Sequence, residues 1–411
     1  MPAEADRQPP LPQDVPQLIQ EATHEADRLA ERFPDDCDAY EVRARILFLV
    51  GKSAAASEAW QRAMELDPRY AYAYHGLGLV ATKKGEYARA AELQRRALEL
   101  SPRLADAARE LCDALLKLGR IEEAIEAMKR YIAVDPDAPE PYVYLGQAYV
   151  ANQQYDKARQ AFEDALARNS EIPRAQYSLA MVLARLGQTE RSRTALEKYR
   201  ALRAKERKVI TDLRSQWDDI EALSAEVAQR YFLAARIYLA HGDAIEAERL
   251  FRRAAALDPK NTDCRVQLAA LYQRTGRPEN ALDMCRELVE IAPEEAVYHL
   301  NLGTMYGNLG RTDEAEQSYR KVIRLAPEDP DGYAALARLY LRTGRRLDEA
   351  VRLAESAVER RRDGPNYYLL SRARARNGDS AGALAAIDKA IELDPENPHL
   401  RQVRAAIENR R

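Results

Sequence analysis

The stretch AVYHLNLGTMYGNLGRTDEAEQSYRKVIRLAP, Ala296–Pro327, predicts two short helices joined by a tight turn. Leu302 and Tyr306 recur at helical spacing on the first helix. Gly310 then suits a left-handed C-cap. Pro327 ends the second helix, because proline lacks the amide donor and clashes with the preceding turn. The stretch therefore predicts one antiparallel helix pair.

Small residues lie where the two helices of such a pair would cross. Gly303 on the first helix and Ala315 on the second lack bulky side chains, so the two axes can approach closely. The same pairing recurs elsewhere, at Gly78 with Ala90, Gly146 with Ala158, Ala235 with Ala247 and Ala269 with Ala281.

The pattern repeats along nearly the whole chain with a fixed period. Prolines that follow an apolar run recur 34 residues apart, at Pro34, Pro68, Pro102 and Pro136 and again at Pro259, Pro293 and Pro327. Pro395 lies two periods beyond the last of these. A constant period of this length is typical of a solenoid built from stacked helical hairpins.

The residues within each period resemble the tetratricopeptide repeat (TPR) family. The order of aromatic, Leu-Gly, Tyr, Gly, Ala, aromatic, Ala and Pro is present in YHGLGLV…GEYARAAELQRRALELSP and YVYLGQAYV…QQYDKARQAFEDALARNS. The resemblance implies an all-α, right-handed superhelix of antiparallel helix pairs. Ten copies are expected, beginning near Cys37, Ala71, Ala105, Pro139, Pro173, Ala228, Thr262, Ala296, Pro330 and Gly364.

The repeat count divides the chain into five segments. Helical caps are expected at both ends, because an uncapped solenoid exposes an apolar face. The expected segments are a disordered tail at 1–13, a capping helix with five repeats at 14–203, a helical insertion at 204–227, five repeats at 228–395 and a C-terminal capping helix at 396–411.

The insertion is the one long departure from the period. The fifth and sixth copies begin 55 residues apart, near Pro173 and Ala228, which is 21 more than the period. Neither glycine nor proline occurs between Gln188 and His241. We expect an elongated second helix or an added helix, either continuous or broken at a turn at 215–219, where helix propensity is lowest.

Two features of the insertion are candidates for binding. Trp217 is either an exposed anchor or, as its apolar seam favours, a packed side chain. A basic run is either a surface that binds phosphate or an acidic partner or, as the neighbouring glutamates favour, a solvated helix face. The run consists of Lys198, Arg200, Arg203, Lys205, Arg207 and Lys208.

Composition narrows the class of protein further. The 411 residues carry a formal net charge of −3, which disfavours nucleic acid as a general partner. No apolar run is long enough to cross a bilayer, and no signal peptide is recognisable. Four scattered cysteines disfavour a disulfide framework. We expect a cytoplasmic protein, or a periplasmic one if a signal peptide was removed; the abundance of Ala and Arg suggests a bacterial source.

The resemblance places a peptide-binding groove on the concave face, lined by the first helix of each repeat. The matching positions are rich in Tyr and Arg, which commonly anchor interfaces. The candidate partner-binding residues are Tyr72, His75, Arg109, Tyr144, Tyr177, Phe232, Arg236, Arg338, Arg342, Tyr368 and Arg372. Tyr72 and Tyr144 have the alternative role of stacking between repeats.

Two specialised versions of the groove are absent from the sequence. The family's carboxylate clamp needs asparagines where this chain has Leu79 and Asp113. The inward asparagine ladder of glycosyltransferase arms is matched by Asn301 alone.

Catalytic patterns are also missing, and we expect no enzyme activity, cofactor or metal. The five histidines lie in different copies, with no ligand spacing among them. The sequence therefore predicts a scaffold that binds a partner protein or extended peptide. The alternatives are a recruiting arm of a larger enzyme or envelope-assembly complex, and a self-associating protein that pairs through the insertion, although a homo-oligomer is not indicated.

Overall fold

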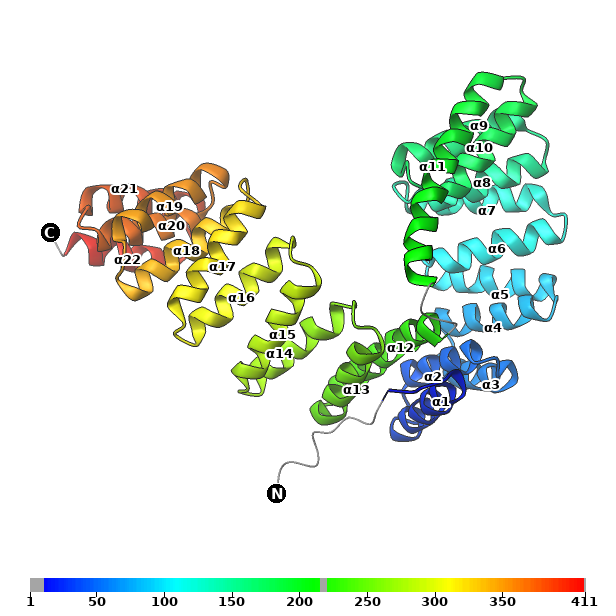
Figure 1. Ribbon diagram of the computed structural model, residues 1–411, viewed down its shortest axis with the longest axis horizontal. Coiled ribbons are helices and arrows are strands. Elements are labelled where there is room, and N and C mark those ends of the chain that lie inside the picture. The colour runs from blue at the N-terminus through cyan, green and yellow to red at the C-terminus, as the bar shows by residue number, and fades with distance from the viewer. Residues whose placement is uncertain (1–10, 215–219, 410–411) are drawn as a thin grey trace. The chain divides into compact units, whose positions relative to one another are not determined.

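The computed structural model describes residues 11–214 and 220–409, with 205–214 described only as helix (Figure 1). Within these ranges every regular element is an α-helix, and the chain divides into two compact units between Asp243 and Ala244. The helices of the first unit are α1 Val15–Arg32, α2 Cys37–Leu49, α3 Ser53–Leu66, α4 Ala71–Lys83, α5 Tyr87–Leu100, α6 Ala105–Lys117, α7 Ile121–Val134, α8 Glu140–Ala151, α9 Tyr155–Arg168, α10 Pro173–Arg185, α11 Thr189–Arg214 and α12 Ile220–Ala240. Those of the second are α13 Ala244–Leu257, α14 Asp263–Arg274, α15 Pro278–Ile291, α16 Ala296–Asn308, α17 Thr312–Leu325, α18 Pro330–Thr343, α19 Leu347–Arg360, α20 Gly364–Arg376, α21 Ser380–Leu393 and α22 Pro398–Glu408.

The antiparallel pairing of helices follows the predicted repeat, so the expected all-α solenoid is confirmed. Glycine ends the first helix of most pairs in the left-handed region, as at Gly310, where φ is 74°. One turn has the same conformation without glycine, since Gln153 has φ 57° at the position that matches Gly119 in the preceding repeat.

The predicted close approach of the paired helices is present in both units. A Cβ added at Gly146 would lie 2.5 Å from the ring of Phe162, and one at Gly303 would lie 2.7 Å from the ring of Tyr319. Ala158 and Ala315 on the facing helices are fully buried. Glycine on the first helix thus makes room for a large side chain on the second.

A recurring hydrogen-bond arrangement, which we call the turn lock, fixes the start of the first helix. Tyr142 Oη donates to the carbonyl of Pro136 at 3.0 Å, and Arg168 Nε donates to the same oxygen at 2.7 Å. The Arg168 guanidinium carbon also lies 3.9 Å from the Tyr142 ring centroid. Equivalent tyrosine-to-proline hydrogen bonds span six residues at Tyr74 and Tyr333.

The insertion is built from two long helices. α11 has 26 residues and α12 has 21, and they end and begin at Arg214 and Ile220. The predicted turn at 215–219, Trp217, and the side chains of Lys205, Arg207 and Lys208 lie outside the described residues, as do residues 1–10 of the predicted tail.

α12 packs against α1 and α2, at the other end of the first unit from α10 and α11 (Figure 1). Tyr231 is fully buried and donates through Oη to Glu21 at 3.3 Å. His241 Nε2 lies 2.7 Å from Asp36 Oδ2, and the ring of His241 stacks on Phe33 with the centroids 4.2 Å apart. Residues separated by more than two hundred positions in the sequence therefore meet in this contact.

This packing moves the boundary between the units relative to the sequence-based one. The second block was expected to begin at 228, but residue 228 lies inside α12, and α12 belongs to the first compact unit. The period carried no information about the packing of α12 on α1 and α2. At the C-terminus, α22 packs on α21 and buries Leu400 and Ile407. Among the described residues, no helix is long and apolar enough to cross a bilayer.

Candidate functional site

In the first unit, two of the predicted groove residues, Tyr72 and His75, lie on α4. Tyr72 is 44% exposed, and its ring centroid lies 5.8 Å from that of Tyr70. His75, by contrast, is only 1% exposed. Tyr72 is accessible to a partner. His75 is not accessible, so the prediction that His75 contacts a partner is wrong.

His75 can be buried because its ring forms a hydrogen bond with Gln94 on α5. Nδ1 of His75 lies 2.9 Å from Oε1 of Gln94, while Gln94 Nε2 donates to the His75 carbonyl at 3.2 Å. Since the amide oxygen can only accept, Nδ1 carries the proton. Burial lowers the pKa of His75 to about 4, so the ring is neutral at physiological pH.

Further along the first unit, the predicted groove side chains engage each other. Arg109 is half-buried and ion-paired with Glu110 at 2.7 Å. Tyr144 is 9% exposed, and Arg174 lies over its ring at 4.9 Å while donating to its Oη at 3.2 Å. Tyr144 therefore follows the stacking alternative, and most of its surface is already covered.

The carboxyls in this part of the surface are partly removed from water. Burial raises the pKa of both Glu110 and Asp113, although neighbouring arginines act in the opposite direction. Tyr177 on α10 is the second accessible aromatic residue, 46% exposed, and its ring centroid lies 5.2 Å from that of Tyr199 of α11, with the two rings tilted by 50°. Accessible aromatics at Tyr72 and Tyr177 thus flank a strip of mutually paired polar groups.

Phe232 and Arg236 were expected in the second block, and both lie on α12 in the first unit. Phe232 is half-buried, and Arg236 is exposed.

In the second unit, Arg338 and Arg342 of α18 line a cavity of about 440 Å³. The other wall is α16, which contributes Leu300, Thr304 and Asn308. These three residues were not predicted, although a signal exists: Thr304 and Asn308 lie one period before Arg338 and Arg342.

A second cavity, of about 270 Å³, lies one repeat further on. It is lined by Arg372 and Arg376 of α20 and by Val403 and Ile407 of α22. Tyr368 is half-buried, its Oη 3.1 Å from Nε2 of His399, and the guanidinium of Arg372 lies 5.8 Å from the ring of Tyr368. The structure thus brings Arg338, Arg342 and Arg372 to neighbouring first helices of one unit, since α18 and α20 pack together.

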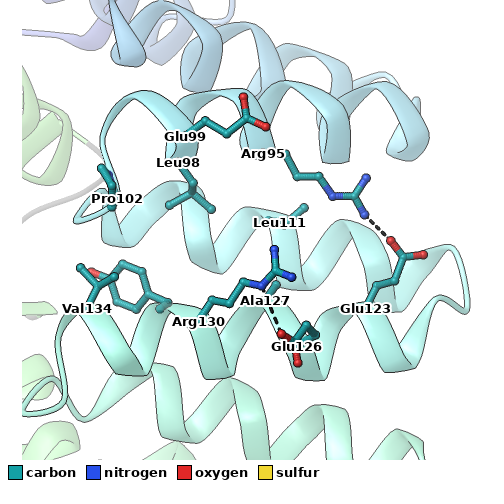
Figure 2. A pocket seen from close by; sticks show the side chains of 11 residues that line it. Arg95, Leu98, Glu99, Pro102, Leu111, Glu123, Glu126, Ala127, Arg130 and Val134 are labelled. Carbon is teal, nitrogen blue, oxygen red and sulfur yellow. Dashed lines mark hydrogen bonds and ion pairs between the residues drawn. The ribbon is translucent and has the colours of Figure 1, made fainter.

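A cleft of about 370 Å³ lies on the outer helices α5 and α7, and Figure 2 shows its lining. Its floor is apolar, with Leu98 and Leu111, and its rim carries the ion pairs Arg95–Glu123 and Arg130–Glu126 (Figure 2).

The same cleft recurs two periods later, between α9 and α11. Leu166 and Leu179 match the floor, and Glu163–Arg191 matches the rim with its charges exchanged. A cleft that recurs with the period follows from stacking of the second helices, so it is a property of the repeat and not a dedicated site.

Groups that could hold a metal or act as a nucleophile are not gathered together. The described residues contain no group of three or more His, Cys, Asp or Glu side chains with metal-binding geometry. Burial raises the pKa of Cys112 and Cys264 to about 12 and that of Cys285 to about 11, so these thiols stay protonated.

Family comparisons agree with the repeat pattern. Sequence models described as tetratricopeptide repeat, or TPR repeat, together match residues 44–206 and 238–397, and the gap between these ranges falls in α11 and α12. No curated protein sequence matches the chain.

Solved structures with a similar fold are distant in sequence. MamA 41-end from Desulfovibrio magneticus RS-1 is 19% identical, with 41% of this chain and 96% of that chain covered and a TM-score of 0.37. Yeast Tom70 is 15% identical over 97% of each chain, with a TM-score of 0.38. The APC/C hetero-tetramer Cut9-Hcn1 is 13% identical over 94% of this chain and 92% of that chain, with a TM-score of 0.36. With its period, its helix pairs and the matched family models, the chain belongs to the tetratricopeptide repeat family and is a protein-interaction scaffold.

Proposed function

We propose that the protein binds a partner protein, or an extended peptide of one, on the surface formed by the first helices of its repeats. The observation that supports this is the pair of cavities on α16, α18, α20 and α22, because three independently predicted residues, Arg338, Arg342 and Arg372, line them. Tyr72 and Tyr177 provide accessible aromatic surface on the corresponding helices of the first unit. Aromatic and arginine side chains are the types that most often dominate binding energy at interfaces.

The test is affinity capture from the source cells with a variant that changes Tyr72, Tyr177, Arg338 and Arg372 to Ala. Each of these side chains is exposed, so the variant is expected to fold, which far-UV circular dichroism checks. The matched control changes Glu126 and Arg130 to Ala, an exposed ion pair on the outer cleft. We expect specific partners to be lost with the first variant and kept with the control.

Retention of the same partners by the first variant contradicts binding on the first helices. Loss with the control alone places the partner on the outer helices instead.

A further inference from the structure

Four exposed arginines of the second unit form one surface, which we call the arginine surface: Arg338 and Arg342 of α18 with Arg372 and Arg376 of α20. The members of each helix are one turn apart, and the two pairs are one period apart. Among the residues that the structure describes, none places a carboxylate oxygen within 4.0 Å of these four guanidinium groups.

An arginine on the outer helix α17, Arg320, is paired instead. Arg320 of α17 contacts Glu316 at 3.0 Å and Glu349 at 2.7 Å. Asp331, the one acidic residue that lines the larger cavity, is held by Arg361 at 3.3 Å. The arginine surface therefore retains uncompensated positive charge, in a chain whose net charge is −3.

The arginines also differ from the equivalent surface of the first unit. There, Arg109 is paired with Glu110, and Arg45 with Glu41 at 2.6 Å. Like charges gathered along a hollow repel one another and attract an oppositely charged ligand. A bound carboxylate would relieve this repulsion in the second unit, whereas the first unit already supplies its own carboxylates.

The shape of the surface indicates an extended ligand. The guanidinium group of Arg342 lies against α16, since a Cβ added at Gly307 would be 2.5 Å from its Nη2. The apolar side chains of Leu300 and Ala335 remain part of the cavity lining. Packed helices lie about 8–10 Å apart, and an extended chain advances about 3.3 Å per residue. Acidic side chains about three residues apart would therefore meet successive arginine pairs.

We propose that the arginine surface binds an extended, acidic segment of a partner protein, with Asp or Glu at about every third position and small or apolar residues between. The guanidinium groups supply charge-assisted hydrogen bonds to the carboxylates. The apolar residues between them fit against Leu300, Ala335 and Ala375. This inference rests on the proposed function and specifies the chemistry of its ligand.

The experiment measures fluorescence anisotropy of the full chain with a labelled peptide of four Glu-Ser-Gly triplets. The expected result is saturable binding that weakens as salt rises, with no binding of the Gln-Ser-Gly counterpart. Arg338→Gln with Arg372→Gln should weaken binding about thirtyfold, equivalent to about 2 kcal/mol, since two charge-assisted contacts are lost.

The matched control is Arg324→Gln with Arg352→Gln. Both residues are exposed, lie on the outer helices α17 and α19 and have the same effect on net charge. Equal weakening by the two double variants would show unspecific attraction and overturn the proposal, as would stronger competition by single-stranded oligothymidylate than by the unlabelled acidic peptide. Equal binding of a peptide with its glutamates adjacent would overturn the three-residue spacing.

The result is separable from that of the capture experiment. If captured partners depend on Tyr72, Tyr177, Arg338 and Arg372 but the acidic peptide does not bind, the scaffold function stands and the ligand chemistry is wrong. If the capture fails and the peptide binds at the arginines, the site exists without the proposed cellular role.

Discussion

His75 shows how a polar residue can be buried in the core of a repeat when it has a hydrogen-bond partner there. Its partner Gln94 occupies the large-residue position of the second helix, where the preceding repeat has Trp60 and the following repeat has Met128. Glu41 makes the corresponding contact one period earlier, accepting a hydrogen bond from Trp60 Nε1. Both pairs are 19 residues apart, so the two contacts are versions of one internal arrangement.

We expect the buried His75 to make the first unit less stable in mild acid. The folded pKa of about 4 lies below the unfolded value near 6.5, so the unfolded chain binds the extra proton in that interval. The free energy of unfolding should therefore fall as pH decreases from about 6.5 to about 4, by about 3 kcal/mol from this residue. Urea unfolding at a series of pH values measures the effect.

The control is His75→Asn, which removes the titrating group but keeps a short amide. The difference in unfolding free energy between wild type and variant should shrink, or reverse in favour of the variant, as pH falls through this interval. A difference that stays constant with pH would mean that His75 does not titrate with a lowered pKa.

At this scale the sequence predicted faces of helices better than contacts. It placed Tyr72, Tyr177, Arg338 and Arg372 on first helices, where all four side chains are exposed. It misplaced His75 because a helical position fixes the direction of a side chain but not whether a polar partner across the pair draws it inward. The spacing of 19 residues to Gln94 was the available signal.

At the scale of elements, the docking of α12 on α1 and α2 depends on few aromatic contacts. Phe33 touches Tyr238 with the ring centroids 5.1 Å apart, in addition to stacking on His241. Burial lowers the pKa of Arg230 on α12, and nearby Arg45 of α2 acts in the same direction. The contact thus includes two arginines whose mutual repulsion opposes it.

Phe33→Ala should loosen this contact. We expect faster hydrogen–deuterium exchange across α12 and the C-terminal half of α1, because the ring supplies packing to both Tyr238 and His241. Exchange in α16 and α18 should be unchanged and serves as the internal reference. Unaltered exchange in α12 would show that Phe33 does not hold it.

The insertion illustrates the limit of reading elements from a period. The excess of 21 residues and the lack of Gly and Pro predicted long helices, and α11 and α12 are long. The packing partner of α12 could not be predicted, because Tyr231 and Glu21 are 210 residues apart and nothing in their local sequence links them.

For the whole molecule, the stacking of successive helices predicts that a destabilising substitution lowers the stability of its own repeat and of the adjacent repeats only. Gly146→Ala forces a methyl group against the buried ring of Phe162, and such overpacking costs about 1–3 kcal/mol, more than the roughly 1 kcal/mol that alanine gains in helix propensity. In a solenoid the effect reaches neighbouring repeats and decays beyond them. Pulsed hydrogen exchange in urea should show earlier unfolding of α8 and α9 with α16–α20 unaffected.

Gly364→Ala is the matched control, since the nearest atom to its added Cβ is 3.8 Å away. It should leave the unfolding of every helix nearly unchanged. A single transition that shifts equally in both units for Gly146→Ala would contradict the local picture.

The contact of α12 with α1 and α2 can form only after α12 has been synthesised on the ribosome. His241 is made 205 residues after Asp36, which at ~5–20 residues per second takes about 10–40 s. Throughout that time α1 and α2 lack the helix that packs on them. The packing of α1 and α2 is therefore completed after α10 has been made, and their uncovered side is available to chaperones for that whole interval.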